Sequence, residues 1–368
     1  MRITQSETAK EVFVTAQPRE ARPADRQAEI LLAEVADVLK TQGAWPVQER
    51  LFGTEDAVRA AADARAAAYG DLADAVPPEL LTVPEGPLGG LNAVQVHAVQ
   101  SEERPAVLTD DGKPCGRMLN LGGVGYVTLS GLTAPEAGAN TDQARYLFEK
   151  ATRLLRRLGG SMQSVARTWL WLGDILAWYD AFNAVRNRFF TESGLIDDTS
   201  GRTRLPASTG IGVGPAGEAA CALDVVAMIG PKASISYHHA AGMQESAYEY
   251  GSAFSRVAKA GTPGGTSVYV SGTAAIDEAG LTRHAGDAAA QIDMTLDNVR
   301  ACLKDMQCGD EDVVHAIAYS KTPDVQTLFD GEYLPRLGWP CVSVLSDVCR
   351  DDLLFELEAT ACPAAETP

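Results

Sequence analysis

Residues 125–131 read Gly-Tyr-Val-Thr-Leu-Ser-Gly, and residues 267–272 read Ser-Val-Tyr-Val-Ser-Gly. Each stretch is followed by a long amphipathic segment, an apolar strand, a second helix and a closing pair of strands. Strands that alternate with helices in this way predict a mixed sheet with helices packed on one face. The sequence therefore predicts an α+β protein with two tandem copies of one unit.

The closing strands of the two copies differ at a position that matters for chemistry. Residues 222–227 of the first copy read Ala-Leu-Asp-Val-Val-Ala, and residues 356–361 of the second read Glu-Leu-Glu-Ala-Thr-Ala. The second copy therefore has Glu356 where the first has Ala222, so the fold itself does not require an acid there. This asymmetry predicts a single active site.

The hydrophobic pattern places the elements of each copy. In the second copy we expect helices at 284–306 and 324–337 and strands at 268–274, 312–319, 341–347 and 353–361. In the first copy we expect helices at 141–158 and 178–190 and strands at 126–132, 165–172, 210–214 and 219–228.

Breaks in these patterns set the boundaries of the units. Residues 1–90 are predicted to be a loose N-terminal arm followed by a helical extension, and the first copy covers 91–230. Residues 231–266 form a long linker rich in Ala, Gly, Tyr and Ser, and the second copy covers 267–368. Long irregular segments in compact proteins are usually functional, so we expect the linker to cover the site as a lid.

The charge balance limits the classes of partner. The 31 basic and 49 acidic residues give a net charge of −18, which would repel the phosphates of nucleic acid. Any small anionic substrate must therefore be held by locally placed arginines. No run approaches the ~20 apolar residues of a membrane span, and the N-terminus lacks the apolar core of a signal peptide. We predict a cytoplasmic protein with no membrane or nucleic-acid partner.

The cysteines and histidines do not indicate a metal site. The seven cysteines are scattered without close pairs, and the five histidines show no metal-ligand spacing. His238 and His239 are adjacent and point in different directions on any regular element. The sequence thus predicts no disulfide framework and no metal.

The second copy resembles the RidA (YjgF/UK114) fold, which is chorismate-mutase-like, through residues 270–274 (Val-Ser-Gly-Thr-Ala) and 355–359 (Phe-Glu-Leu-Glu-Ala). A degenerate unit carrying residues 205–212 (Leu-Pro-Ala-Ser-Thr-Gly-Ile-Gly) in front of a full unit resembles the chorismatases, in particular the 3-hydroxybenzoate synthase-like subgroup. The resemblance spans roughly residues 90–362, and residues 167–169 and 180–190 belong to its most specific parts. It implies release of pyruvate from chorismate without a metal or organic cofactor, in secondary metabolism.

Glu356 is the predicted general acid. Cleavage of an enol ether requires a proton on the enolpyruvyl methylene carbon, and a carboxylic acid that is neutral near pH 7 can donate it. Glu356 lies between Phe355 and Leu357, where burial would raise its pKa. The alternative is a strand with one wet face, and for Glu358 we favour a structural role because Asp224 keeps an acid in the first copy.

Two carboxylates on the substrate call for two cationic side chains, and the planar fork of arginine suits them. We predict Arg145 and Arg204, the former because the resemblance places a substrate arginine there. Arg204 precedes a turn whose Ser208, Thr209 and Gly210 offer hydroxyl and N–H groups to an anion. The alternative for either arginine is an exposed, solvated charge.

Three further residues complete the predicted site. Gln244 and Tyr248 of the linker are predicted to orient the ring hydroxyl of the substrate, although a tyrosine can equally pack a domain junction. By resemblance, a cysteine at the position of Cys349 goes with formation of 3-hydroxybenzoate, whereas its absence goes with hydrolysis to a dihydroxycyclohexadiene carboxylate. The plain alternative for Cys349 is a small buried side chain.

Two other functions compete with the chorismatase prediction. A RidA-like imine or enamine deaminase needs an arginine before the Cys-Val strand, where this sequence has Trp339. A non-catalytic RidA-fold binding protein is the other alternative, because this fold commonly packs as a trimer and can lose its activity. A monomer and a homotrimer are both compatible with the sequence.

Overall fold

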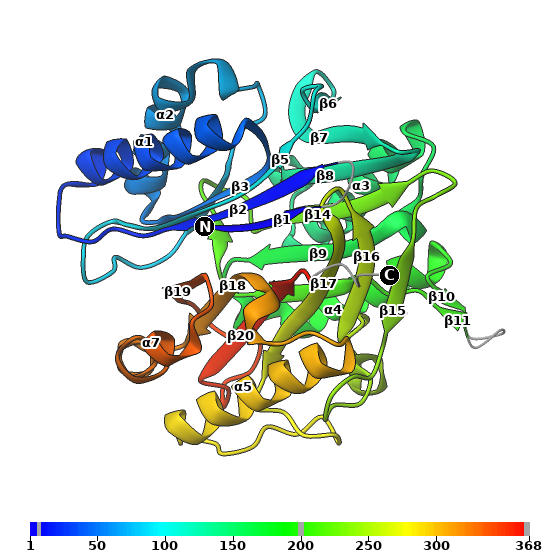
Figure 1. Ribbon diagram of the computed structural model, residues 1–368. Coiled ribbons are helices and arrows are strands. Elements are labelled where there is room, and N and C mark those ends of the chain that lie inside the picture. Colours follow the sequence, from blue (N-terminus) through cyan, green and yellow to red (C-terminus); the bar gives the residue numbers. More distant parts are fainter. Residues whose placement is uncertain (6–8, 198–201, 364–368) are drawn as a thin grey trace.

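The computed structural model describes residues 1–5, 9–197 and 202–363. Its strands form three six-stranded mixed sheets and one short hairpin, with the helices at the periphery (Figure 1). The predicted α+β class is therefore confirmed.

The first sheet is built almost entirely from the N-terminal residues. Its strand order is β1-β2-β5-β3-β4-β13. Its elements are β1 (Arg2–Gln5), β2 (Lys10–Ala16), α1 (Ala24–Gln42), β3 (Ala44–Gly53), α2 (Glu55–Tyr69), β4 (Glu79–Thr82) and β5 (Leu91–Gln100), joined by β13 (Gly214–Pro215) from the middle of the chain.

The second sheet corresponds to the predicted first copy. Its strand order is β12-β9-β14-β8-β7-β6. Its elements are β6 (Ala106–Asp110), β7 (Lys113–Leu121), β8 (Val124–Leu132), α3 (Asn140–Arg157), β9 (Val165–Leu172), α4 (Ile175–Glu192), β12 (Ala207–Ile211) and β14 (Cys221–Ile229). The hairpin of β10 (Ile196–Asp197) and β11 (Arg202–Thr203) precedes β12.

The third sheet corresponds to the predicted second copy. Its strand order is β15-β16-β17-β20-β18-β19. Its elements are β15 (Ile235–His238), β16 (Val257–Thr262), β17 (Gly265–Ala274), α5 (Ala288–Asp305), β18 (Val313–Ser320), α6 (Pro323–Leu328), a π-helical turn (Phe329–Tyr333), α7 (Leu334–Leu337), β19 (Cys341–Leu345) and β20 (Phe355–Ala361).

Local sequence explains how these helices begin and end. The side chain of Asp287 accepts a hydrogen bond of 3.0 Å from the N–H of Ala290 and so caps the first turn of α5. Gly43 ends α1 with a φ of 59°, a left-handed conformation that glycine adopts without a steric penalty.

The N-terminal region differs from the prediction of an arm and a helical extension. The expected helical extension is present as α1 and α2, but the expected loose arm contains β1 and β2. Strand β5, which we assigned to the first copy, pairs with β2 and β3. Part of the expected linker also forms β15 and β16, which extend the third sheet.

The N-terminal sheet repeats the connectivity of the other two. In each sheet the last strand of the unit lies between the strand before the first helix and the strand after it, in the orders β2-β5-β3-β4, β8-β14-β9-β12 and β17-β20-β18-β19. The pairs β3–β4, β9–β12 and β18–β19 are all parallel. The chain thus contains a third unit of the same topology, which its sequence did not reveal.

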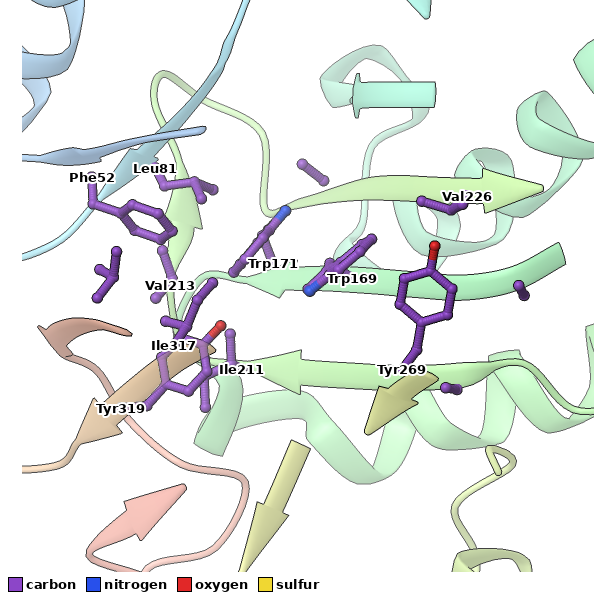
Figure 2. Close-up of a cluster of buried hydrophobic side chains, with 14 of the residues drawn as sticks. Phe52, Leu81, Trp169, Trp171, Ile211, Val213, Val226, Tyr269, Ile317 and Tyr319 are labelled. Atoms are coloured by element: carbon purple, nitrogen blue, oxygen red, sulfur yellow. The ribbon is translucent and has the colours of Figure 1, made fainter. Parts of the chain in front are cut away.

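The inner faces of the three sheets meet in one shared hydrophobic core (Figure 2). Phe52 of β3 and Trp171 of β9 pack edge to face there, with ring centroids 6.2 Å apart. The same core includes Ile211 of β12 and Tyr319 of β18. The helices pack against the outer faces in three separate clusters, so each sheet is covered on both sides.

Buried ion pairs join the sheets across this interior, and the arginines of two of them lie against Trp169. Arg50 Nε lies 3.0 Å from Asp224 Oδ2 and joins the first sheet to the second. Arg167 Nη2 lies 2.9 Å from Glu358 Oε2 and joins the second sheet to the third. The ring of Trp169 lies between the two arginines, with its centroid 3.9 Å from Arg50 Cζ and 4.6 Å from Arg167 Cζ.

Candidate active site

A cavity of about 520 Å³, including its opening to solvent, lies where the edge of the second sheet meets the third sheet. Strand β12 supplies one wall, and the ends of β17 and β20 supply the other. The lining residues are Tyr179, Arg186, Ser208, Gly210, Tyr250, Ser252, Phe254, Arg256, Gly272, Ala274, Ile276, Cys349, Arg350 and Glu356. The site therefore combines side chains from two units and from the segment that connects them.

Glu356 lies at the start of β20 and is only 5% exposed. Within the described residues, its carboxyl group has no hydrogen-bond or ion-pair partner, and one of its oxygens rests against the backbone of Gly272. Burial and the nearby Glu358 raise the pKa of Glu356 to about 8, although Arg167 and Arg256 oppose this shift. Glu356 is therefore largely a neutral acid at pH 7.

Arginines and aromatic rings alternate along the cavity. The Phe254 centroid lies 5.7 Å from Arg186 Cζ and 5.6 Å from Arg256 Cζ. The Tyr250 centroid lies 5.5 Å from Arg256 Cζ and 5.6 Å from Arg350 Cζ. The rings separate three cations that would otherwise repel each other.

None of these three arginines has a carboxylate partner among the described residues. Arg186 donates to Asn183 Oδ1 at 2.6 Å, and its buried Nε has no partner within the described part of the chain. Arg256 donates to the carbonyl oxygen of Glu245 at 3.1 Å and to the hydroxyl of Tyr250. Because Arg186 and Arg256 are almost fully buried, an anion between them would compensate two desolvated charges.

Cys349 lines the same cavity, in the loop between β19 and β20. The residue is half-buried by accessible surface, while its thiol lies among protein atoms. Burial, together with the neighbouring Glu356, raises the pKa of Cys349 to about 12, so the group is a neutral thiol. It is therefore placed to shape the cavity rather than to act as a thiolate nucleophile.

The two arginines predicted from the sequence do not line the cavity. Arg145 lies on α3 and forms ion pairs of 2.7 Å with Glu149 and Glu192. Arg204 is exposed and donates to Gln163 Oε1 at 3.2 Å, along a separate surface groove. Arg145 is already paired with two carboxylates and Arg204 is exposed. The structure therefore does not place either of them where it could bind a substrate carboxylate in this cavity.

The segment after Arg204, predicted as a turn, is strand β12, and only some of its predicted residues face the cavity. Ser208 and Gly210 line the cavity, whereas Thr209 faces the interior and accepts a hydrogen bond of 2.6 Å from Arg167 Nη2. Successive residues of a strand point to opposite faces, which explains the division.

The two linker residues predicted to contact the substrate, Gln244 and Tyr248, lie next to the cavity but do not line it. Gln244 is buried and donates to the carbonyl oxygen of Ile276 at 2.9 Å, so it supports the wall rather than lining it. Tyr248 packs against the core of the second unit, and Tyr250 lines the cavity in its place.

Ten lining residues were not predicted, among them Tyr179, Arg186, Arg256 and Arg350, which carry ionisable groups. Tyr179 precedes, and Arg186 falls within, residues 180–190, a segment that the resemblance singled out without identifying the residue. Arg256 and Arg350 carry no local signal, because the fold of the loops before β16 and β20 brings them to the cavity.

The described residues were also expected to lack a metal site and a membrane span. They contain no group of three or more His, Cys, Asp or Glu side chains that could hold a metal ion. In the same part of the chain, no helix is both long and apolar enough to cross a membrane.

The architecture and the cavity together define an α+β protein of tandem units with a site between two of them. The same fold is found in a crystal structure of a chorismatase, with a TM-score of 0.66 and 19% sequence identity over 98% of this chain and 100% of that chain. Two single-unit structures also match: a putative endoribonuclease L-PSP from Entamoeba histolytica (TM-score 0.30, 16% identity, 35% of this chain and 100% of that chain) and RidA from the Antarctic bacterium Psychrobacter sp. (0.26, 20%, 30% and 88%). No family model and no curated protein matches this sequence.

Proposed function

We propose that the protein cleaves the enolpyruvyl ether of chorismate, or of a close relative, and releases pyruvate. The observation that carries this proposal is a neutral buried acid, Glu356, in one cavity with two buried arginines that lack carboxylate partners. Chorismate carries two carboxylates and an acid-labile enol ether, which matches this set of groups. The shared fold with a chorismatase supports the same reaction class.

In the proposed reaction, Arg186 and Arg256 bind the two carboxylates and hold the substrate still. Glu356 gives its proton to the methylene carbon of the enolpyruvyl group, and the electron pair of the double bond forms the new C–H bond. An oxocarbenium ion results, and the Glu356 carboxylate that remains lies beside the cation. The neighbouring positive and negative charges stabilise each other in a site with little water.

The second step decides the product. Attack by the neighbouring ring hydroxyl, followed by aromatisation, gives pyruvate and 3-hydroxybenzoate with no water consumed. Attack by water consumes one molecule and gives pyruvate and a dihydroxycyclohexadiene carboxylate. We propose the first outcome, because the Cys349 side chain occupies part of the cavity next to Glu356 and takes space that an attacking water would need.

The RidA-like deaminase remains the alternative enzyme. In the third sheet, its carboxylate-binding arginine would fall at Trp339, which is 5% exposed and belongs to the core under α7. An indole there cannot bind a carboxylate as a guanidinium does. The arginine row near Glu356 therefore favours a dicarboxylate over a small imino acid.

The proposal is tested by incubating purified protein with chorismate, measuring pyruvate enzymatically and identifying the second product by chromatography and mass. We expect stoichiometric pyruvate and 3-hydroxybenzoate. A diene acid would retain the reaction class and contradict the role of Cys349. Pyruvate at the spontaneous rate would reject the proposal, and ammonia from an enamine substrate would establish the deaminase.

A further inference from the structure

Behind Glu356, a chain of hydrogen bonds joins four strands. Glu358 of β20 accepts from Arg167 Nη2 of β9 at 2.9 Å, and the same Nη2 donates to Thr209 Oγ1 of β12 at 2.6 Å. Thr209 Oγ1 also accepts from the backbone N–H of Gly272 on β17 at 3.0 Å. Except for Gly272, these residues are at most 4% exposed, so the chain is shielded from solvent.

The last member of this chain touches the acid itself. A Cβ atom placed on Gly272 would lie 2.1 Å from Glu356 Oε1 and 3.1 Å from Thr209 Cγ2. The Glu356 carboxyl group therefore rests on the backbone that Thr209 holds. A shift of Arg167 or Thr209 would move this support.

Two members of the chain, Glu358 and Arg167, also carry opposite charges close to Glu356. Glu358 is two residues from Glu356 on the same face of β20, a separation of about 7 Å. Glu358 is held by a second bond of 2.6 Å from Trp169 Nε1, so its carboxylate is fixed in place. The ionisable groups around Glu356 come from all the surrounding elements: Arg167, Tyr179, Arg186, Tyr250, Arg256, Tyr319, Cys349, Arg350 and Glu358.

We propose that Glu358, Arg167 and Thr209 are positioning residues that hold the Glu356 carboxyl group on Gly272 and set its affinity for the proton. This positioning role rests on the proposed function only in one respect, namely that the proton of Glu356 is transferred to the substrate. It gives Thr209 a role behind the acid instead of the substrate contact predicted from the sequence. It also gives Glu358 a second role besides the structural one.

The second sheet shows a related arrangement, but its closing strand has no glutamate at the position that corresponds to Glu356. Asp224 pairs with Arg50 and accepts from the N–H of Gly131 at 2.9 Å. Ala222 stands two residues before Asp224, where the third sheet has Glu356, and the carboxyl group that lies against Gly131 is that of Glu79 from β4. The ion pair alone is therefore compatible with a purely structural role. A test must separate the two roles.

Opposite changes of charge at the two ends of the ion pair provide that test. In Glu358→Gln, Arg167 remains charged and a negative charge is lost, so Glu356 should release its proton at lower pH. In Arg167→Met, Glu356 and Glu358 become a coupled pair of acids, whose upper titration step should move to higher pH. We expect shifts on the order of one pH unit in each direction.

The readout is the infrared band of the protonated carboxyl group, followed from pH 5 to 10 and assigned by comparison with the same protein carrying Glu356→Gln. This measurement needs no substrate. Shifts in opposite directions support the inference, whereas no shift, or shifts in the same direction, overturn it. If the shifts appear but chorismate yields no pyruvate, the proposed function fails and the positioning role stands.

Thr209 provides an independent test if either charge variant fails to fold. Thr209→Val removes the hydroxyl that joins Arg167 to Gly272 and should lower kcat at least 10-fold with little change in KM. Thr209→Ser keeps the hydroxyl and should retain most of the turnover. Equal turnover of the valine and serine variants would contradict the role of this hydroxyl.

Discussion

Two glutamates on one face of one strand show how surroundings decide the role of a residue. Glu358 accepts from Arg167 and Trp169 and is a fixed carboxylate in an ion pair. Glu356, two residues earlier, has no such partner within the described residues, and burial raises its pKa to about 8. A buried carboxyl group without a cationic partner stays protonated, whereas one that is paired with an arginine is ionised and has a structural role.

The raised pKa of Glu356 must cost stability. Its ordinary value is 4.5 and its folded value about 8, so the folded protein holds a proton that the unfolded chain loses between these values. Stability from this group is therefore fully present below pH 4.5 and is lost as the pH rises toward 8. We predict that Glu356→Gln gains about 3–4 kcal/mol relative to the wild type between pH 4.5 and pH 7.5.

This gain is measured by urea unfolding of both proteins at the two pH values. The difference between pH values cancels any constant cost of burying the amide. A gap between the two proteins that does not change with pH would contradict the neutral state of Glu356.

Substitution of arginines distinguishes the substrate-binding residues that the structure indicates from those predicted from the sequence. Arg186→Ala or Arg256→Ala removes a charge-assisted contact to a substrate carboxylate and should raise KM for chorismate by about 10- to 100-fold. Arg145→Ala and Arg204→Ala are matched controls, since both lie outside the cavity, and they should leave KM within about twofold. Steady-state kinetics of the four variants decide; a large effect in the controls with none in Arg186→Ala would reverse the assignment.

At this scale the sequence located part of the site. Glu356, Cys349, Ser208 and Gly210 all line the cavity, and their functional roles stay predictions. The arginines were not located, because an arginine carries no local pattern that says which face or loop end will meet a cavity. A difference between two repeats, such as Glu356 against Ala222, can be read from the sequence. The meeting of loops that are distant in sequence, which brings Arg256 and Arg350 to the cavity, cannot.

At the scale of elements, the position of the Glu356 side chain against β17 depends on one missing side chain. Gly272 has no Cβ, and a methyl group there would overlap Glu356 Oε1 at 2.1 Å. We predict that Gly272→Ala displaces the acid, lowers turnover at least 100-fold and destabilises the fold by about 1–3 kcal/mol.

The matched control is Gly331→Ala, where an added Cβ has no atom within 4 Å. Both variants are compared by pyruvate release and by urea unfolding. Wild-type turnover in Gly272→Ala would show that the close contact does not position Glu356.

Most elements of the two predicted copies were correctly placed. The expected helix at 284–306 is α5 (Ala288–Asp305), and the expected strand at 312–319 is β18 (Val313–Ser320). Strand β3 was missed, because it is buried almost throughout and carries Gln48, Glu49 and Arg50 in its centre. Buried polar residues that are paired across sheets break the alternation on which strand prediction depends.

At the scale of the whole molecule, the junctions between the three similar units differ in the side chains that they hold. Where the first sheet meets the second, the Glu79 carboxyl group lies against Gly131. Where the third meets the first, the ring of Phe13 stacks on His97 at 4.4 Å and meets His315 edge-on at 5.2 Å. The junction of the second and third sheets instead holds Glu356 with Arg186, Arg256 and Arg350.

The junctions also make the stability of the sheets interdependent. Asp224→Asn would leave Arg50 buried without its counter-charge, and we predict a loss of about 3–5 kcal/mol. Chemical unfolding followed by tryptophan fluorescence measures this change. The double variant Arg50→Met/Asp224→Leu removes both charges and should recover most of the loss, whereas equal loss in the single and double variants would contradict a dominant role for the unpaired charge.

The central claim is that Glu356 donates the proton that cleaves the substrate. The most direct test compares the initial rate of pyruvate release from chorismate by the wild type, Glu356→Gln and the exposed control Glu218→Gln, with chorismate binding measured by calorimetry. We predict that Glu356→Gln binds chorismate with a nearly unchanged Kd but releases pyruvate only at the spontaneous rate, while Glu218→Gln behaves as the wild type. Undiminished turnover in Glu356→Gln would contradict the account.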